Sequence, residues 1–429
     1  MAATAVQGRE EREPKPAGAA PLSAGSRAAA FWRYWGASTV SGVGDAVTAV
    51  ALPLLAVLAL HASAFEVSLV TAAAYAAWLL IGLPAGVLVH RLPLRGTQVA
   101  MDLLRAAAVA SVPAAAALGV LTLPQLVAVA LVVGLASVVF DVGNSTFLPS
   151  IVSKEELTAR NSLTSGTRAA TQLGGPSLGG VLVQLFGAAA SIVVDAVSYL
   201  ASAALMGTLP QVAHPAQEGP RRAVGEMIRE GWRYVTRHPI IGPCVADATA
   251  VNFVCGGLMA LTPVFLVRTL GAPPALVGVL IATEGIGSLL GAALTPRIVA
   301  RLGSGRAVCW AAVTSPCFAA LMPLAGHGAG LALFVLGNAG FAGAVVVLSI
   351  VTRTHRQTAT PAELLPRVMA TVRFISWGAI PFGALAAGGA AALWGTRGAL
   401  AIMALIAVAS PAILLTSPIR RLRELPQTP

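Results

Sequence analysis

The sequence contains very little charge. Only 10% of its 429 residues are Asp, Glu, Lys or Arg, whereas 56% are hydrophobic; a soluble domain has roughly 25% charged residues. An apolar excess of this size cannot be buried inside one or two water-soluble domains. Because a membrane-spanning helix needs about 20 mostly apolar residues, the composition predicts an all-α membrane protein with about a dozen spans.

Cysteine, lysine and aromatic residues are also scarce. The four cysteines form no CxxC pair, which argues against a disulfide framework or a zinc site, and the six histidines have no metal-binding spacing. The only lysines are Lys15 and Lys154, and neither belongs to a GxxxxGK[ST] phosphate-binding loop, which argues against pumping driven by ATP hydrolysis within this chain. We expect no cofactor and no metal.

Twelve apolar runs follow a polar tail, 1–30, whose composition predicts disorder. They cover about 34–60, 65–89, 97–119, 123–145, 161–185, 187–209, 243–268, 275–297, 305–326, 329–352, 369–394 and 397–417. Their connections alternate between short, nearly uncharged ones and ones that carry arginine. Of the 28 Lys and Arg residues, all but Arg268 and Arg397 fall on one side, so the positive-inside rule places both termini in the cytoplasm. The net charge of +11 is therefore orientation information, and we expect no nucleic-acid partner.

The chain divides into two halves of six predicted helices each. We expect an N-terminal bundle over 31–209, a cytoplasmic linker over 210–242, a C-terminal bundle over 243–417 and a tail over 418–429. Within the linker, 221–235 has apolar residues at helical spacing opposite arginines, which predicts an amphipathic helix on the inner membrane face. Gly82-xxx-Gly86-xxx-His90 recurs with a shift of 205, and Glu156-Leu-x-x-Arg160 with a shift of 207. Two parallel repeats of six helices are typical of one transporter architecture, with a central site between the halves.

From about 31 to 425 the chain resembles the major facilitator superfamily. Gly86-Val-Leu-Val-His90-Arg91-Leu-Pro-Leu-Arg95 is similar to that superfamily's loop between the second and third helices, although His90 replaces an acidic residue and Pro93 a glycine. Gly175-Pro176-Ser-Leu-Gly179-Gly180, in the fifth predicted helix, resembles a motif of antiporters that work as exporters.

Three further stretches resemble the branch that contains macrolide-type and enterobactin-type exporters. They are Ser41–Asp45, Phe140-Asp141 with Leu148-Pro149, and Arg356-Gln357 with Thr360–Val368, in which Pro366 replaces the usual glycine. The resemblance implies a secondary transporter in which two bundles rock between inward-open and outward-open states.

Carboxylates inside the apolar runs are the candidates for coupling transport to an ion gradient. An ionisable group costs roughly 2.5–3.5 kcal/mol at the centre of a membrane helix, so its presence usually has a reason. Asp45 and Glu284 lie near the middle of the first and eighth predicted helices, and Asp195 and Asp247 are further candidates. Alternatively, each of these carboxylates pairs or hydrogen-bonds within or between helices and serves structure only.

Charged residues also gather at the cytoplasmic ends of the predicted helices. Asp102 and Arg105 are three residues apart and can pair on one helix face. The family resemblance implies a cytoplasmic gate of ion pairs there, and ordinary positive-inside anchoring is the alternative. The gate candidates are Gly86, His90, Arg91, Arg95, Asp102, Arg105, Asp141, Arg168, Arg367 and Arg373.

Two other groups of residues are candidates for packing and for the cavity. Gly175, Pro176, Gly179 and Gly180 allow a close helix approach and a local kink, because glycine has no side chain and proline lacks an N–H. Polar and aromatic residues within the runs could face a cavity, and lipid-facing placement is the alternative for the tryptophans. These cavity candidates are Tyr75, Trp78, Asn144, Asn252, Asn338 and Trp377.

The sequence therefore predicts a monomeric, multi-pass transporter of a bacterial cell membrane. By resemblance it exports a small, moderately apolar molecule, such as a drug, antibiotic or secondary metabolite, in exchange for protons. An importer or facilitator of a metabolite, and a non-transporting membrane scaffold or sensor, remain alternatives. We expect no enzymatic activity, because no loop presents a nucleophile–base pair or a metal constellation.

Overall fold

The structure is a computed structural model that describes residues 24–82, 85, 92–153, 156–211, 224–361 and 363–426. Within these residues it is built from helices, with no strand. The first six long helices, here called the N-half, are α1 (Ala24–Leu58), α2 (Ala64–Ile81), α4 (Leu94–Ala117), α5 (Leu123–Ile151), α6 (Leu157–Phe186) and α7 (Ala188–Gly207).

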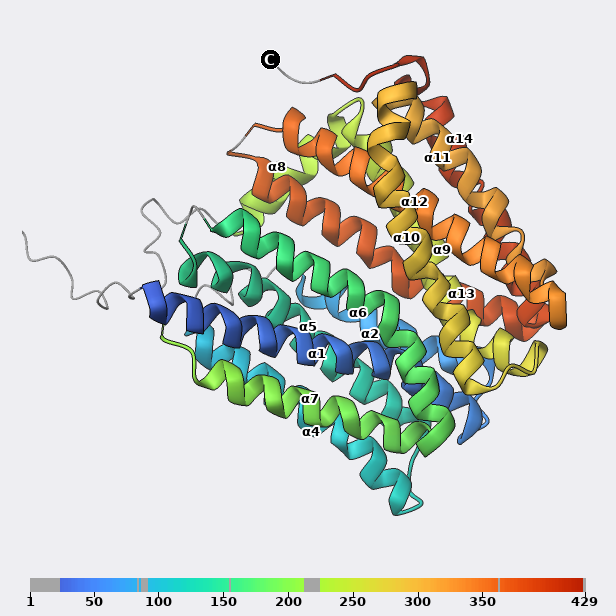
Figure 1. Ribbon diagram of the computed structural model, residues 1–429. Helices are drawn as coiled ribbons and strands as arrows, with labels where there is room; N and C mark the ends of the chain where they lie inside the picture. Colours follow the sequence, from blue (N-terminus) through green and yellow to red (C-terminus); the bar gives the residue numbers. More distant parts are fainter. Residues whose placement is uncertain are drawn as a thin grey trace, which may run out of the picture.

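The remaining long helices lie on the other side of the molecule (Figure 1). Helix α8 (Val224–Arg237) comes first, and the C-half then consists of α9 (Ile241–Val264), α10 (Pro274–Leu302), α11 (Ser304–Ala319), α12 (Leu331–Ala359), α13 (Leu365–Ile406) and α14 (Ala409–Thr416). A π-helical turn, Phe265–Thr269, extends α9, and short 3₁₀ turns cover Met322–Leu324, Gly328–Gly330 and Pro418–Arg421. The expected boundaries between tail, bundles and linker stay predictions.

Each of the twelve predicted apolar runs coincides with helix in the described residues. Ten stretches are long and apolar enough to cross a membrane. Helix α6 is not among them, because its first half is polar, and Arg367–Thr416 counts as one stretch although Gly395 breaks α13 with φ of 69°. The structure thus confirms a polytopic helical protein, whereas the count of twelve spans and the cytoplasmic termini stay predictions.

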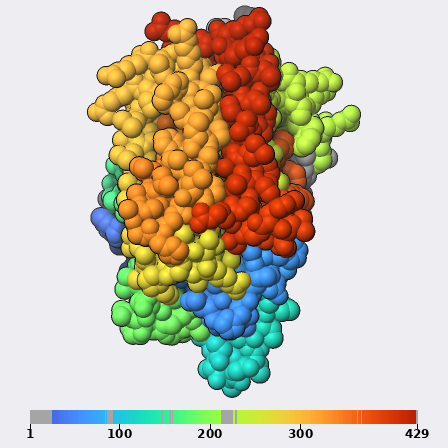
Figure 2. Space-filling model, turned by 90° about the vertical axis from the view of Figure 1, so that its right-hand side faces the viewer, coloured from blue at the N-terminus to red at the C-terminus, as the bar shows by residue number. Residues whose placement is uncertain are grey.

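The largest apolar core that the two halves share lies toward the end where the connections are short. The largest cluster of buried apolar side chains includes Leu54, Val129 and Ile192 of the N-half together with Phe265 and Leu400 of the C-half. At the same end the Arg268 guanidinium donates a hydrogen bond of 2.7 Å to the carbonyl of Ala62. Figure 2 faces this end and shows the yellow segment around residue 270 against the blue and green N-half.

At the opposite end, where the basic connections lie, the apolar clusters separate. One cluster belongs to the N-half and contains Phe31, Phe147 and Met206. Another belongs to the C-half and contains Val308 and Leu348. No residue between 156 and 174 of α6 whose exposure is described is buried. The halves are therefore packed less closely toward the basic end, where a smaller contact between Trp78 and Trp377 still joins them.

Helix α8 is amphipathic, as the sequence predicts. It packs against α13, where Gly231 lies so close that a Cβ would be 3.0 Å from the carbonyl oxygen of Arg367. Glu230 of α8 forms an ion pair with Arg367, while Trp232 is 47% exposed on the outer face. The helix is therefore fixed to the basic end of the C-half.

Candidate functional site

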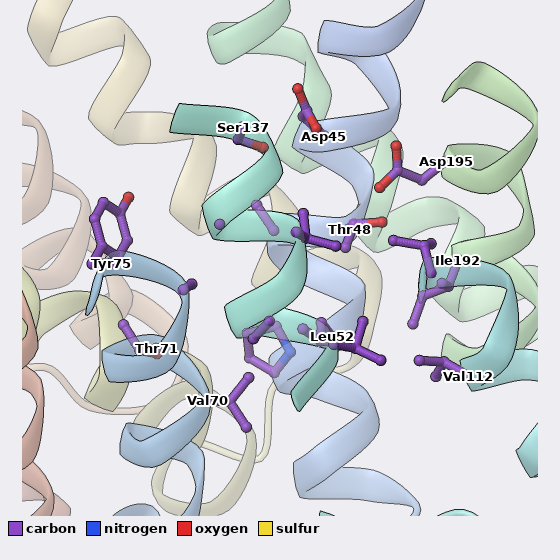
Figure 3. A pocket seen from close by; sticks show the side chains of 18 of the residues that line it. Asp45, Thr48, Leu52, Val70, Thr71, Tyr75, Val112, Ser137, Ile192 and Asp195 are labelled. Carbon is purple, nitrogen blue, oxygen red and sulfur yellow. The ribbon is translucent and has the colours of Figure 1, made fainter. Parts of the chain in front are cut away.

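A largely apolar pocket of about 330 Å³ lies inside the N-half. Helices α1, α2, α4, α5 and α7 supply its walls, and Met259 of α9 joins them from the C-half. Figure 3 shows aliphatic side chains at one end of the pocket and polar ones at the other. The aliphatic end includes Leu52, Val70 and Val112, and the polar end includes Asp45, Thr48, Ser137 and Asp195.

Asp45 enters the pocket from the middle of α1 and is exposed there. Its carboxylate accepts a hydrogen bond from the hydroxyl of Tyr199 on α7. The preceding Gly44 makes this contact possible, because a Cβ at that position would lie 2.0 Å from Ser198 Oγ and 2.3 Å from Asp195 Oδ1. Helices α1 and α7 can therefore approach closely at the level of the two carboxylates.

Asp195 is fully buried on α7, in the wall of the same pocket. Its Oδ1 accepts a hydrogen bond of 3.1 Å from Ser198 Oγ. Its Oδ2 accepts none from the described part of the chain, and Thr48 Oγ1, which faces this carboxyl, also lacks a hydrogen-bonded partner there. Thr48 is thus the hydroxyl that interacts with this carboxylate from α1, without a hydrogen bond of ordinary geometry.

A buried ion pair lies behind Tyr199. Arg105 and Asp102 of α4 pair directly and are 2% and 0% exposed, and Ser202 donates a hydrogen bond of 2.7 Å to the second oxygen of Asp102. The Arg105 guanidinium carbon lies 4.2 Å from the ring centroid of Phe140 and 4.4 Å from that of Tyr199. Tyr199 therefore separates this cation from the pocket while it contacts Asp45 with its hydroxyl.

Further titratable groups surround this cluster. Asp141 of α5 lies within electrostatic range of Asp45 and Arg105, and Tyr75 of α2 lines the pocket. The arrangement can bind a proton or a cation on Asp45 and Asp195, and it changes the net charge of the pocket when it does.

A comparison with protein families then identifies the chain. A family model described as "Transmembrane secretion effector" matches residues 17–429. The chain belongs to this family of major facilitator superfamily transporters. It is similar to the uncharacterized MFS-type transporter YfiS of Bacillus subtilis (strain 168), with 27% identity over 83% of this chain and 85% of the relative. It is also similar to the multidrug efflux pump Tap of Mycolicibacterium fortuitum, with 27% identity over 82% of this chain and 87% of Tap.

Solved structures agree on the fold. The nucleoside transporter NupG aligns with a TM-score of 0.75 and 11% identity over 90% of this chain and 98% of its own. A bacterial homologue of the iron transporter ferroportin, in an inward-facing state, aligns with a TM-score of 0.69 and 15% identity over 90% of this chain and 98% of that homologue. The protein is therefore a multi-pass membrane transporter and not an enzyme.

The other two predicted carboxylates of the transporter lie outside this pocket. Glu284 is exposed on α10, within electrostatic range of Tyr75 on α2 and Cys255 on α9. Asp247 of α9 is 2% exposed and accepts a hydrogen bond of 2.6 Å from Ser410 of α14. Glu284 thus lies between the halves, whereas Asp247 connects two helices of the C-half.

The predicted gate residues of the transporter fall into separate places. Asp141 lies within electrostatic range of Arg168 of α6 and Arg373 of α13. The Arg373 guanidinium carbon lies 4.1 Å from the ring centroid of Trp78 and 4.6 Å from that of Trp377. These contacts bring α2, α5, α6 and α13 together across the two halves.

The remaining gate candidates lie in different parts of the molecule, and three of them are outside the described residues. Asp102 and Arg105 pair as their spacing predicts, but the pair lies in the interior behind the pocket. Arg367 pairs with Glu230 of α8, and Arg95 is half-buried in the first turn of α4. Gly86, His90 and Arg91 lie outside the described residues. Whether any of these residues gates transport stays a prediction.

The glycines of the fifth-helix motif, in α6, lie at close helix contacts. A Cβ at Gly175 would be 2.2 Å from the Cβ of Ala46, and one at Gly179 would be 3.2 Å from Val47 of α1. Gly180 faces Gly278 of α10, whose Cα would be 2.8 Å from a Cβ at Gly180. The Pro176 carbonyl lies against the same Gly278. The motif therefore joins α6 to α1 on one side and to the C-half on the other.

Of the cavity candidates, Tyr75 and Trp78 line the pocket. Trp377 packs on Trp78 with ring centroids 4.9 Å apart. The three asparagines are elsewhere in the transporter. Asn338 donates to Leu280 O and Thr283 Oγ1, Asn252 donates to Ala248 O, and the backbone carbonyl of Asn144 accepts from Tyr34.

The sequence alone did not single out Tyr199. It follows Asp195 by four residues, so the two share one helix face, and this spacing was the available signal. The contact with Asp45, 154 residues away, had no signal in a single sequence.

Proposed function

We propose that this transporter exports small, moderately apolar molecules in exchange for protons by alternating access. The observation that carries the proposal is the pair Asp45 and Asp195 on the polar end of an otherwise apolar pocket. Ionisable residues within membrane spans usually mark proton or substrate pathways. The similarity to a multidrug efflux pump supports export, and the apolar walls suit a molecule such as a drug, antibiotic or secondary metabolite.

Asp45 is the proposed coupling residue, and Asp195 its partner. Asp45 is exposed in the pocket, so a proton can reach it when the halves part. In the proposed cycle, the carboxylate takes up a proton from the outside and releases it to the cytoplasm, while the substrate moves in the opposite direction. The proton gradient is the energy source, and the protein acts as a monomer in the cell membrane, with both termini in the cytoplasm.

The energy of one proton is sufficient for useful export. A charge that moves through 100 mV releases about 2.3 kcal/mol, and a tenfold concentration ratio corresponds to about 1.4 kcal/mol. One proton per neutral substrate could therefore sustain a ratio of several tens.

The test is accumulation of labelled antibiotics and dyes in an efflux-deficient host. Cells express the wild type, Asp45→Asn or the control Asp247→Asn at matched levels, with and without a protonophore. We expect the wild type and Asp247→Asn to lower accumulation of at least one compound, and both Asp45→Asn and the protonophore to abolish this. Uptake that runs inward, or that persists without the gradient, would instead indicate an importer or facilitator. If no compound of the panel responds, a dedicated metabolite or siderophore carrier becomes the better interpretation, whereas a scaffold or sensor predicts that neither Asp45→Asn nor Glu284→Gln changes any flux.

A further inference from the structure

The charges that line the N-half pocket are all of one sign. Asp45 and Asp195 line it, and none of its described lining residues is Lys, Arg or His. The nearest buried cation, Arg105, is paired with Asp102 and covered by the Tyr199 and Phe140 rings. Arg105 also interacts with Asp45 and Asp195, so one buried cation faces three carboxylates, and the cluster keeps a net negative charge when all three ionise.

A ligand without positive charge would leave that negative charge in an apolar cavity. An unpaired charge in such surroundings is costly, and a cation of the ligand removes the cost by pairing with the carboxylate. Asp195 lines the pocket, and its Oδ2 makes no hydrogen bond of ordinary geometry within the described part of the chain, although the Thr48 hydroxyl interacts with this carboxylate.

The rest of the lining suits an organic cation with an apolar body. Tyr75, Trp78 and Tyr199 line the pocket, and aromatic ring faces attract cations. The Trp78 and Tyr199 rings already contact Arg373 and Arg105, at 4.1 and 4.4 Å, so among the described lining residues Tyr75 is the ring that such a contact leaves free. The end of the pocket that contains Leu52 and Val112 offers aliphatic surface, away from the carboxylates (Figure 3). A volume of about 330 Å³ lies within the roughly 300–1,000 Å³ of small-molecule pockets.

We infer that this pocket selects monovalent organic cations, namely amines or quaternary onium compounds with an apolar body, which bind with the charge on Asp45 and Asp195. The inference rests on the proposed function only for its consequence, that the bound cation is the transported substrate. Binding itself requires no gradient and can be measured on the purified protein.

The experiment measures binding to purified, full-length transporter in detergent. The probes are tetraphenylphosphonium, a cation, and triphenylphosphine oxide, a neutral compound with a similar apolar body. Affinities for the wild type, Asp45→Asn, Asp195→Asn and Asp247→Asn are obtained by isothermal titration calorimetry. Asp247→Asn is the matched control, because Asp247 is a buried carboxylate that does not line the pocket.

We expect the wild type to bind the cation at least tenfold more tightly than the oxide. Asp45→Asn and Asp195→Asn should each weaken cation binding about tenfold and leave oxide binding within twofold, and Asp247→Asn should change neither. Equal affinities for the two probes, or equal losses of both in the pocket variants, would overturn the inference.

The outcome is separable from that of the accumulation assay. Selective cation binding without proton-driven export would leave the inference standing and refute the proposed function. Proton-driven export of neutral compounds only, without preference for tetraphenylphosphonium, would refute the inference and leave the proposed function standing. If one of the two pocket variants does not purify as a single species, the other carries the test, because each removes one carboxylate from the lining.

Discussion

At the scale of single residues, Tyr199 has two separate contacts. Its hydroxyl donates to Asp45 in the pocket, and its ring covers the guanidinium of Arg105. Because these contacts involve different parts of one side chain, substitutions can separate them.

Tyr199→Phe removes the hydroxyl and keeps the ring. We expect efflux to fall several-fold, because Asp45 loses its protein donor, while the thermal midpoint changes little. Hydrogen bonds to charged groups contribute about 1.5–3 kcal/mol, and exposed Asp45 can replace this one with water. Tyr199→Leu should lower the thermal midpoint as well, because it uncovers Arg105. If Phe and Leu reduce efflux and stability equally, the two contacts are not separable.

We expect the effects of substituting Asp102 and Arg105 on the free energy of unfolding to depend strongly on each other. Removal of one partner from a buried ion pair costs about 3–5 kcal/mol, because the other charge stays buried and uncompensated. Arg105→Met and Asp102→Asn should each destabilise the protein by such an amount, and the double variant by less than the sum. Thermal unfolding of the wild type, the two single variants and the double variant measures this double-mutant cycle. Losses of stability that simply add would contradict the pairing.

At the scale of helices, the contact between α6 and α10 holds the halves together near their shared core. Gly180 and Gly278 allow the two backbones to touch. An added methyl group in such a contact costs about 1–3 kcal/mol of stability. A single alanine at either glycine is therefore expected to destabilise the contact between α6 and α10.

Gly180→Ala should therefore destabilise the arrangement seen here and reduce transport by about tenfold or more. Gly174→Ala is the matched control, since a Cβ at Gly174 meets nothing within 4 Å; it should transport like the wild type. Efflux and thermal unfolding of both variants provide the comparison. Equal activity of the two variants would show that the α6–α10 contact does not limit transport.

The turn between α8 and α9 depends on a neutral histidine. His238 Nδ1 accepts hydrogen bonds from the backbone N–H groups of Ile240 and Ile241, at 3.2 and 3.1 Å. Burial lowers the pKa of His238 from its ordinary value of 6.5. Since protonation removes the acceptor, this contribution to stability is complete above the unfolded-state pKa and is lost as the pH falls through the lowered folded-state pKa.

His238→Asn keeps an acceptor oxygen and removes the titration. We expect the wild type to lose more thermal stability than His238→Asn between pH 7 and about 5. Because His355 and other groups titrate in both proteins, the difference between the two pH profiles is the relevant quantity. Parallel profiles would exclude a role for the His238 proton.

At the scale of the whole molecule, the apolar core explains the direction in which the halves open. They share the largest cluster toward the end with short connections, whereas most clusters at the basic end belong to one half. If the basic end lies in the cytoplasm, as proposed, the looser end of the arrangement faces inward.

Reporter fusions test this orientation. Alkaline phosphatase is active only outside the cytoplasm, so a fusion at Gly326, between α11 and α12, should be active. A fusion at Gly303, between α10 and α11, should be inactive, and a fluorescent protein at the C-terminus should fluoresce. The opposite pattern would reverse the proposed orientation and with it the direction of opening.

The sequence could predict the features that the membrane itself imposes. The apolar runs, the amphipathic helix α8 and the intramembrane carboxylates follow from composition and spacing. Polar and ionisable groups are costly in the hydrocarbon core, so the sequence of a membrane helix must be almost entirely apolar. The contacts between distant segments could not be predicted. The spacing of Asp102 and Arg105 indicates a pair, but it does not show whether the pair faces the interior or the surface. The residues around Gly180 contain no signal that Gly180 contacts Gly278. Helix α6 is less apolar than a span is expected to be, because its first half is largely exposed where the halves part.

In the proposed function, protons move through Asp45 in exchange for substrate. Its most direct test uses proteoliposomes that contain a pH-sensitive dye, to which a compound that responds in the accumulation assay is added on one side. We expect the compound to drive proton movement in the opposite direction with the wild type and Asp247→Asn, and not with Asp45→Asn. Substrate movement by the wild type without any proton movement, or an unchanged proton signal in Asp45→Asn, would contradict the account.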